Sequence, residues 1–467
     1  MNNYYFNNKD LFYTLKKDYR IYLQKTGDMI HIKREEKSSD LGDDYRMNNA
    51  KLLARQIKTG GVYNQLSNIK TIVFEVTDAC NLNCTYCTYG EFYCNYDTRK
   101  NKFIDINKAK LLIDFLLENK KNPESNSLNN EVLISFYGGE PILNMDFIHE
   151  MVSYTKKKEN EFVKFKYNMT TNGVLLIKYI PFFIQYNFDI MVSLDGSREN
   201  NAYRLFQNGD SSFDRTYKNM IYIRDNYPVF FERNILFNSV IHNLNNKKEV
   251  FCFFQNEFHK TPTFAKVNVV GVKPELIEQF KIMATPKQEI PDEKIENEMK
   301  RVMDLNYDKA KIIEQFIFQF SGNKYRTYKD LILRKSNVRY LSSGTCFPFS
   351  RKIFMTVNNK ILPCERIGHQ FSLGRVSEDG VEISCKEIAR KYTNLSESLR
   401  GLCSRCYHAG FCSECMYLVK NLCTEKKLEC EKFVFQSGFN HLLYSGIEQL
   451  SQSPDLYRRI MEEVFTF

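Results

Sequence analysis

Short apolar runs and longer amphipathic stretches follow one another regularly between residues 69 and 270. The runs have the length and the β-branched content of buried strands, and they cover Thr71–Val76, Glu131–Tyr137, Val163–Met169, Phe188–Leu194, Ile235–Ile241 and Ala265–Val270. The stretches between them have helical spacing, as in Ile106–Leu117, Asn144–Thr155 and Phe213–Arg224. Alternating strands and helices predict βα units and a parallel sheet. Six units predict an α/β fold, a partial (β/α)6 TIM-like barrel that binds ligands at the carboxyl ends of its strands.

The pattern before residue 69 is different. Strand-like runs at Tyr4–Phe6 and Met29–Lys33, with helical apolar spacing over Leu11–Leu23, predict a small α+β unit over residues 1–68. The charged residues 34–46 predict a loop inside this unit. The unit is either a structural cap on the barrel or a docking module for a peptide.

The pattern after residue 270 divides into three parts. Residues 271–340 are charged and mostly helical in spacing, which predicts a linker. Residues 341–435 show little periodicity and many cysteines, which predicts a cysteine-rich domain. Residues 436–467 have the pattern of an amphipathic helical tail.

Composition narrows the class of protein. With 467 residues, 43% of them hydrophobic, the chain can build two or three globular domains. No apolar run is long enough for a membrane-spanning helix and no secretory signal is visible, so we expect a cytoplasmic protein without membrane contact. The formal charge of +10 is spread along the chain rather than gathered in one arm, which argues against a nucleic-acid partner.

The fourteen cysteines point to metal chemistry, because thiols of a reducing compartment remain available as ligands. Cys80, Cys84 and Cys87 follow the first predicted strand directly. Three thiolates on one short loop can hold three irons of a cubane cluster and leave the fourth iron open. The alternative is a zinc site, although zinc prefers four ligands and paired Cys-x-x-Cys spacing.

This loop, with the strand before it and Tyr86 just before its last cysteine, resembles the signature of the radical S-adenosylmethionine (radical SAM) superfamily. The resemblance implies a [4Fe–4S] cluster whose open iron is chelated by the amino and carboxylate groups of SAM. One electron, supplied by a reductant such as flavodoxin or ferredoxin, then cleaves SAM. The resulting 5′-deoxyadenosyl radical abstracts a hydrogen atom from the substrate.

The same resemblance implies SAM-binding residues at the ends of the predicted strands. Asn172 would lie near the ribose, and Arg204 would bind the SAM carboxylate as a fork, unless it is an ordinary surface arginine. Asp195 would orient substrate or cap a turn. The complete implied set is Tyr86, Gly138, Gly139, Glu140, Asn172, Ser193 and Arg204.

Nine cysteines lie between Cys346 and Cys430, and their spacing resembles the SPASM domain of peptide-modifying enzymes, which holds two auxiliary [4Fe–4S] clusters. The resemblance implies an outer cluster on Cys403, Cys406, Cys412 and Cys430. It implies an inner cluster on Cys346, Cys364 and Cys415, completed by Cys423 or Cys385 or left with an open iron. Two features depart from the pattern: Asn359 replaces a glycine, and Cys415 follows Cys412 one residue early. A structural zinc site is the alternative.

Glu365 follows Cys364 directly. In sulfatase-maturing relatives an aspartate at this place is proposed to take the substrate's proton, so the resemblance makes Glu365 a candidate catalytic base. The alternative is an acid paired with Arg366.

The resemblance thus implies a radical SAM/SPASM maturase. It would abstract hydrogen from a ribosomally made precursor peptide and form a thioether, carbon–carbon or carbon–oxygen crosslink, with residues 1–68 binding the leader. Two other functions remain open. One is an anaerobic sulfatase maturase that forms formylglycine, and the other is a non-catalytic iron–sulfur or zinc scaffold that binds a peptide.

Overall fold

The computed structural model divides the chain into two units, residues 58–302 with 348–388 and residues 1–57 with 303–347 and 389–467. The residues that it describes are 5–7, 10–15, 19–23, 29–33, 56–120, 131–289, 295, 299, 324–325, 344–406, 409, 412, 414–422, 426–435, 438 and 465–466.

Six parallel strands form the centre of the unit that contains residues 58–302. They are β5 (Thr71–Thr77), β6 (Glu131–Gly138), β7 (Lys164–Thr171), β8 (Asp189–Ser193), β9 (Ile235–Ile241) and β10 (Thr263–Lys266). They lie side by side in chain order, and each neighbouring pair is parallel. Five of the six predicted strands and the α/β fold class are confirmed, whereas the sixth strand, expected over Ala265–Val270, lies earlier, at Thr263–Lys266. Parallel strands with helical crossovers are covered on both faces, which is why β5 is buried over six of its seven residues.

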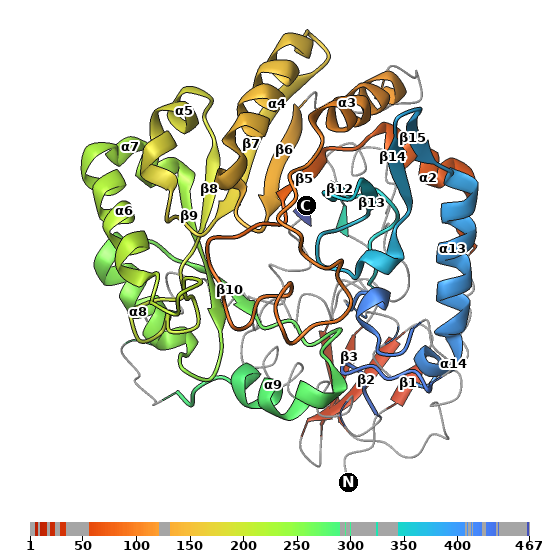
Figure 1. Ribbon diagram of the computed structural model, residues 1–467. Helices are drawn as coiled ribbons and strands as arrows, with labels where there is room; N and C mark the ends of the chain where they lie inside the picture. The colour runs from red at the N-terminus through yellow and green to blue at the C-terminus, as the bar shows by residue number, and fades with distance from the viewer. Residues whose placement is uncertain are drawn as a thin grey trace. The chain divides into compact units, whose positions relative to one another are not determined.

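Helices follow the strands and lie along the outer side of the curved sheet (Figure 1). Helix α4 shows why these helices form. The Asn144 side chain caps its amino end by accepting a hydrogen bond from the Phe147 N–H at 3.4 Å. Ile148, Met151 and Val152 form its buried apolar face. The helices are α2 (Thr59–Ser67), α3 (Ile106–Lys120), η1 (Pro141–Asn144), α4 (Met145–Lys158), η2 (Leu176–Tyr179), α5 (Ile180–Gln185), α6 (Phe213–Asn226), α7 (Pro228–Asn234), α8 (Lys247–Phe258), η3 (Pro274–Leu276) and α9 (Ile277–Ala284).

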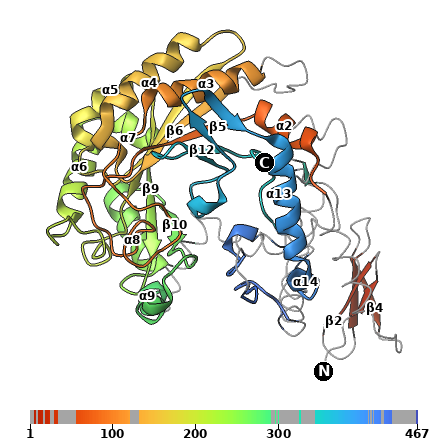
Figure 2. The same ribbon diagram turned by 45° about the vertical axis from the view of Figure 1, so that its right-hand side comes forward.

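The sheet continues into residues that the sequence assigned to a separate domain. Strand β12 (Ile353–Met355) pairs parallel with β5, and β13 (Lys360–Leu362), β14 (Gly374–Ser377) and β15 (Gly380–Ile383) follow as antiparallel neighbours. The result is one ten-stranded sheet, visible from two sides in Figures 1 and 2. These four strands, which the sequence places after the expected boundary at residue 341, thus extend the parallel sheet, because β12 covers the free edge of β5. The 3₁₀ helix η4 (His369–Phe371) precedes β14.

The turn between β12 and β13 explains one departure from the family pattern. Asn359 has a φ of 60°, the left-handed region in which a glycine is usual and an asparagine is tolerated.

The second unit contains an antiparallel sheet of β1 (Tyr5–Asn7), β2 (Asp10–Leu15), β3 (Tyr19–Leu23) and β4 (Met29–Lys33). The helix predicted over Leu11–Leu23 is wrong, because β2 and β3 form a hairpin in which Tyr13 pairs with Ile21. Apolar residues at every second position of each strand also fit this arrangement. The unit further contains α14 (Arg400–Cys403) and η6 (Met416–Leu418), while α13 (Cys385–Ser398) spans the boundary between the units.

Several sequence predictions fall largely outside the described residues, namely the loop at 34–46, most of the linker at 271–340 and most of the tail at 436–467. Two short described pieces differ from the helical expectation: β11 (Lys324–Tyr325) pairs parallel with β16 (Phe465–Thr466). Among the helices that are described, none is long and apolar enough to cross a bilayer.

Candidate functional site

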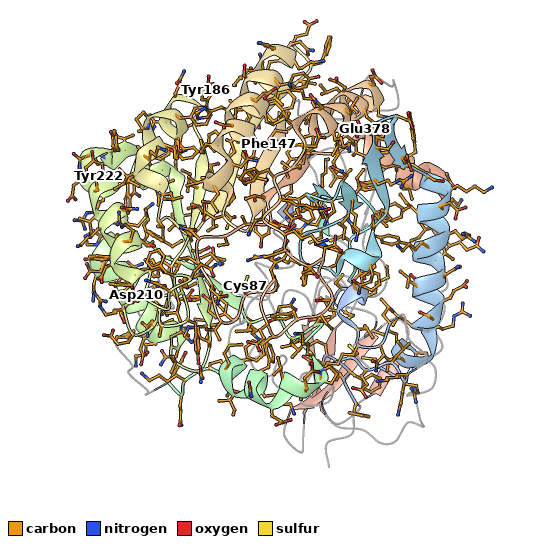
Figure 3. The ribbon with its side chains drawn as sticks, in the orientation of Figure 1. Cys87, Phe147, Tyr186, Asp210, Tyr222 and Glu378 are labelled. Atoms are coloured by element: carbon orange, nitrogen blue, oxygen red, sulfur yellow. The ribbon has the colours of Figure 1, made fainter. Side chains whose placement is uncertain are left out.

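The three-cysteine loop begins where β5 ends, at the carboxyl edge of the parallel sheet. Figure 3 shows Cys87 on the inner side of the curved sheet, whereas Tyr186 and Tyr222 lie on the outer helices. Two turns shape the loop: the Cys87 N–H donates to the Cys84 carbonyl at 3.0 Å, and the Gly90 N–H donates to the Cys87 carbonyl at 2.7 Å.

A segment after β8 supports the loop from one side. The Asn83 N–H donates to the Leu205 carbonyl at 2.7 Å, the Thr85 N–H donates to the Tyr203 carbonyl at 3.0 Å, and Leu82 bridges to Phe206. The backbone of the cysteine loop is therefore fixed before any metal binds.

The thiols of the loop lie close enough to interact. Burial raises the pKa of Cys80 to about 11 and that of Cys84 to about 12. The neighbouring Cys87 thiolate contributes to both shifts, whereas Arg204 lowers the pKa of Cys84. The Leu82 N–H donates to the Cys80 sulfur at 3.4 Å. Thiols that are buried together in this way favour binding to a cation over free ionisation.

Gly138 and Gly139 lie directly against the start of the cysteine loop. The Gly139 N–H donates to the Thr77 carbonyl at 2.8 Å, and the Glu140 N–H donates to the Ala79 carbonyl at 2.9 Å. A methyl group on Gly139 would lie 2.0 Å from the Ala79 carbonyl oxygen, and Gly138 has a φ of 134°. Only glycine allows this approach of two strand ends.

Glu140 joins the ends of β6 and β7. Its buried carboxylate accepts from the Thr171 hydroxyl and the Asn172 N–H, both at 2.7 Å, and from the Ile142 N–H at 3.2 Å. The Asn172 side chain in turn donates to Asn81 of the cysteine loop at 2.8 Å. The structure thus brings Glu140 and Asn172 to the loop and shows both holding strand ends together.

The pH dependence of stability tests the burial of Glu140. Burial raises its pKa from 4.5 to about 7. The folded protein therefore holds this proton more tightly than the unfolded chain, and ionisation costs stability as the pH rises from about 5 to about 8, by roughly 3 kcal/mol. We expect Glu140→Gln to flatten the decline of the free energy of unfolding over that range, measured by urea denaturation. Glu75, whose pKa burial also raises to about 7, is present in both proteins and cancels in the comparison. Equal slopes would contradict the assignment.

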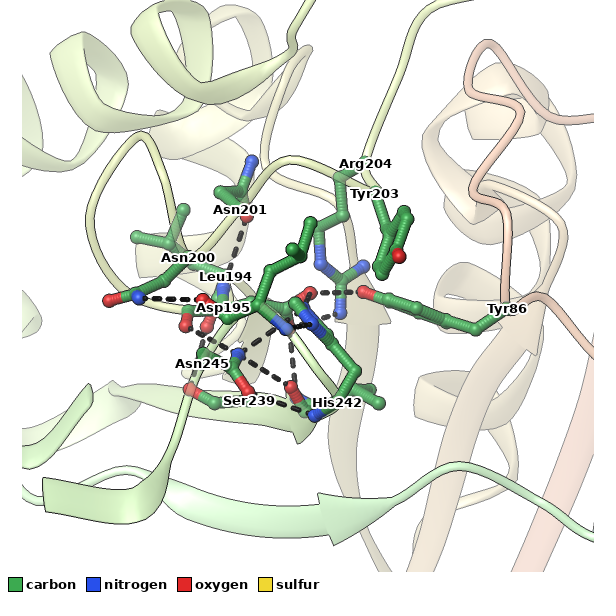
Figure 4. Close-up of polar contacts among 12 residues, drawn as sticks. Tyr86, Leu194, Asp195, Asn200, Asn201, Tyr203, Arg204, Ser239, His242 and Asn245 are labelled. Atoms are coloured by element: carbon green, nitrogen blue, oxygen red, sulfur yellow. Dashed lines mark hydrogen bonds and ion pairs between the residues drawn. The ribbon is translucent and has the colours of Figure 1, made fainter. Parts of the chain in front are cut away.

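Asp195 is the centre of a buried polar network just after β8 (Figure 4). Its carboxylate accepts from the Tyr86 hydroxyl, from Arg204 Nη2 at 3.0 Å and from the Val240 N–H at 2.8 Å. His242 Nε2 lies 3.9 Å away. Because Tyr86 lies between Cys84 and Cys87, Asp195 anchors the cysteine loop to β8 and β9.

Arg204 is therefore not a surface arginine. Its side chain is 8% exposed, pairs with Asp195 and lies 5.5 Å over the Tyr86 ring. Its Nε is buried without a hydrogen-bond partner in the described part of the chain. Ser193 lies at the end of β8, paired in register with Asn238. Binding of the SAM carboxylate by Arg204 and contact between Ser193 and SAM stay predictions.

Cys364 and Glu365 belong to the same unit as the cysteine loop. Burial raises the pKa of Tyr96 to about 12, and the thiolates of Cys364 and Cys87 both contribute, so Tyr96 lies near both cysteines. Glu365 accepts from Lys352 Nζ at 3.0 and 3.1 Å, whereas Arg366 is 4.0 Å away. Burial alone would raise the pKa of Glu365, but Lys352, a backbone hydrogen bond and Arg366 together outweigh it and the pKa is lowered. The expected pairing with Arg366 is thus mainly a pairing with Lys352.

The cysteines of the second unit form two groups. Burial raises the pKa of Cys403 to about 12, with contributions from Cys412, Cys406 and Cys430. Burial raises the pKa of Cys415 to about 11, with a contribution from Cys346. These groups match the implied outer set and two members of the inner set. Cys385 begins α13, and Cys423 lies outside the described residues.

The superfamily model for radical SAM proteins matches residues 74–250, which run from β5 into α8. The chain has a radical SAM domain. Radical SAM cyclopropyl synthase TigE of Paramaledivibacter caminithermalis is 24% identical over 422 residues, 84% of this chain and 80% of the relative. A cysteine-type anaerobic sulfatase-maturating enzyme of Clostridium novyi is 29% identical over 198 residues, 41% of this chain and 49% of the relative.

A solved structure, native anSMEcpe with bound AdoMet, aligns with a TM-score of 0.52 at 16% identity. The alignment covers 84% of this chain and 100% of that one, which shows that the two proteins share a fold. The match over residues 74–250 and the enzymes among the relatives show an enzyme with a radical SAM domain.

Radical SAM enzymes hold a [4Fe–4S] cluster and SAM, and the loop residues fit that group. No three His, Cys, Asp or Glu side chains of the described ranges converge as ligands of a single ion. A cubane cluster needs no such convergence, because each thiolate binds a different iron. Cys80, Cys84 and Cys87 would hold the cluster, and the strand ends at Gly139, Asn172 and Ser193 would line the SAM site.

Sequence reasoning missed residues that hold this site in place, among them Asp78, Lys352 and the neighbours of Arg204 in the segment 203–207. Asp78 carried a signal of a turn, since an aspartate after a strand often bonds to nearby backbone groups, but its actual partners, the Lys100 and Lys102 N–H groups, are distant in sequence. The partners of Lys352 and of residues 203–207 are distant in sequence, and no local pattern identifies them.

Proposed function

We propose that this radical SAM enzyme is a peptide maturase that abstracts hydrogen from a ribosomally made precursor peptide and forms a crosslink within it. The similarity to TigE over 84% of the chain carries the proposal, because it extends well beyond the radical SAM domain into the cysteine-rich region. TigE is a cyclopropyl synthase, an activity that closes a ring through a carbon–carbon bond. Among the three crosslinks, this relationship favours a carbon–carbon bond.

Auxiliary clusters are part of the proposal. Cys403, Cys406, Cys412 and Cys430 form one group of thiols, as four ligands of a cluster would. Cys346 and Cys415, which belong to the same unit, form a second group. Such clusters would accept the electron that remains when a substrate radical closes a bond.

Within the chain, each residue has a limited task. When bound, the cluster and SAM supply the hydrogen-abstracting radical. Tyr86 and Asp195 fix the loop, and Gly138 and Gly139 allow the close backbone approach. Glu365, held ionised by Lys352, would accept the proton released from the substrate.

Sulfatase maturation is the second candidate, since a cysteine-type anaerobic sulfatase-maturating enzyme shares 29% identity over about half of its length. The solved anSMEcpe fold has also been observed with the Kp18Cys peptide bound. Against this candidate, the acid after Cys364 is a glutamate, whereas the sulfatase-maturing relatives are proposed to use an aspartate at this place.

One experiment separates these functions. The anaerobically reconstituted enzyme is incubated with SAM, a strong reductant and either short peptides encoded beside its own gene or a cysteine peptide from a sulfatase. We expect 5′-deoxyadenosine, and the loss of two hydrogen atoms from a neighbouring-gene peptide by mass spectrometry. Conversion of the sulfatase cysteine to an aldehyde would show sulfatase maturation instead. No 5′-deoxyadenosine, or zinc in place of iron, would support a non-catalytic scaffold.

A second experiment tests leader binding by the N-terminal sheet, β1 to β4. Antiparallel sheets with free edges bind extended peptides by adding a strand. We expect deletion of residues 1–57 to weaken precursor binding at least about tenfold, measured by fluorescence anisotropy, while SAM cleavage without peptide continues. Unchanged affinity would refute the leader-binding role and leave the catalytic proposal intact.

A further inference from the structure

Arg99 lies beside the cysteine loop and has no role in the site described above. Its Nη2 donates to the Cys87 sulfur at 3.6 Å, and its guanidinium carbon lies 4.4 Å from the centre of the Tyr89 ring. Its Nε is buried and lacks a hydrogen-bond partner among the residues that the structure describes. A cation that stacks on one aromatic ring and donates to a thiol is held in one plane.

The backbone that carries Arg99 is fixed to the start of the loop. The Asp78 carboxylate accepts from the Lys100 N–H at 3.0 Å and from the Lys102 N–H at 2.6 Å. The Thr77 hydroxyl donates to the Lys102 carbonyl at 2.7 Å. Because Asp78 precedes Cys80 by two residues, Arg99 and the cysteine loop share one anchor.

The other side of the segment is fixed to the β12–β13 hairpin and the residues after it. Asp97 pairs with Lys360 Nζ at 2.7 Å and accepts from the Asn358 side chain at 3.0 Å. The Asp97 N–H donates to His369 Nδ1 at 3.2 Å. The position of Arg99 is therefore determined from both sides, as a preorganised donor requires.

The charge of Arg99 acts on the loop as a whole. Besides its contact with Cys87, it lowers the pKa of Cys80 and that of Glu75, an acid on β5. Glu75 Oε2 accepts from the Val357 N–H at 2.9 Å, so this acid has a partner of its own. Arg99 is thus left to stabilise negative charge on the cysteine sulfurs.

We propose that Arg99 raises the reduction potential of the cluster held by Cys80, Cys84 and Cys87. Net charge and hydrogen bonds to the sulfurs set the potential of a [4Fe–4S] cluster, and a cationic donor stabilises the more negative, reduced state. In that step the cluster gains one electron and a low-potential donor, such as a ferredoxin-type protein or dithionite, loses it. No atom or proton is transferred. The inference rests on the cluster alone and not on the peptide substrate.

An anaerobic redox titration followed by electron paramagnetic resonance tests this role, without SAM or peptide. The signal of this cluster is the one that is missing in Cys84→Ala. We expect Arg99→Met to lower the ratio of reduced to oxidised cluster about tenfold at a fixed potential. This corresponds to a downward shift of the midpoint reduction potential of about 59 mV for one electron. Arg99→Lys keeps the charge without the planar fork and should shift less. The control is Arg198→Met, which removes an exposed arginine paired with Asp214.

Each result decides the question. A midpoint potential in Arg99→Met equal to that of the wild type and of Arg198→Met would overturn the proposal. If Arg99→Met fails to hold iron, the titration is read from Arg99→Gln, which removes the charge but keeps a polar side chain. A lower potential in Arg99→Gln supports the role, and an unchanged one reduces Arg99 to a folding residue. Failure of the maturase function cannot produce either result, because no substrate is present. If the wild type and Cys84→Ala give the same iron signal, the loop of Cys80, Cys84 and Cys87 holds no cluster, and the proposal for Arg99 fails with it.

Discussion

Replacing Cys84 by alanine should abolish SAM cleavage and remove about four irons per chain. Cys84 is the middle ligand of the loop, and Arg204 lies near its thiol, so the site has both a buried thiol and a cation to stabilise the thiolate. Two remaining cysteines cannot hold a cubane cluster against competing thiols. Iron content after anaerobic reconstitution and 5′-deoxyadenosine release by chromatography measure the effect.

The matched control for this variant is Cys94→Ala. Cys94 lies seven residues after Cys87 and is exposed, with its sulfur 3.4 Å from the Gly271 carbonyl. We expect wild-type iron content and SAM cleavage in this variant. Loss of iron in Cys94→Ala, or retention of SAM cleavage in Cys84→Ala, would show that the loop is not the catalytic cluster site.

A methyl group on Gly139 should destabilise the protein by at least about 2 kcal/mol and lower its iron content. The group would lie 2.0 Å from the Ala79 carbonyl oxygen and 2.6 Å from the carbonyl carbon, and both are backbone atoms that no rotamer change can move. To relieve this clash, β6 must move away from the cysteine loop. That movement breaks the hydrogen bond from the Glu140 N–H to the Ala79 carbonyl. Urea denaturation of the metal-free protein and iron analysis of the reconstituted protein measure both effects.

Gly60→Ala is the control for this steric argument. Gly60 lies in the first turn of α2, and a methyl group there would meet no atom within 4 Å. Alanine also favours a helix over glycine, so stability should be unchanged or slightly higher. Equal effects of the two substitutions would mean that the close approach at Gly139 does not hold the loop.

The local sequence pattern was sufficient to predict the parallel strands and the position of the glycine motif at their carboxyl edge. The apolar run Ile235–Ile241 has the same bounds as β9, and the helix predicted over Ile106–Leu117 lies within α3. Both have one dominant period and are long enough to show it. The glycines at Gly138 and Gly139 were placed correctly beside the loop, because parallel strand ends share one edge.

The hydrophobic pattern of the sequence did not predict the structure where a segment fits two periods, or where its pairing partner is distant in the chain. Leu11–Leu23 fits a helix if its polar centre is ignored, but its two halves alternate as β2 and β3 do. Strand β12 has only three residues, too few to show a period, and its partner β5 lies in a remote part of the chain. The ion pair between Arg204 and Asp195 depends on how the chain turns back between these two residues. Sequence motifs do not give the path of that turn.

The pairing of β12 with β5 has a consequence during synthesis. Ile353 pairs with Ile72, so roughly 280 residues must follow β5 out of the ribosome before its neighbour exists, which takes roughly 15–60 s at 5–20 residues per second. During that time a strand that is buried in the finished protein presents a bare edge, the kind of surface that recruits other chains into aggregates. The nascent chain is therefore most exposed to chaperones, and most dependent on them, while the barrel is complete except for its last parallel strand.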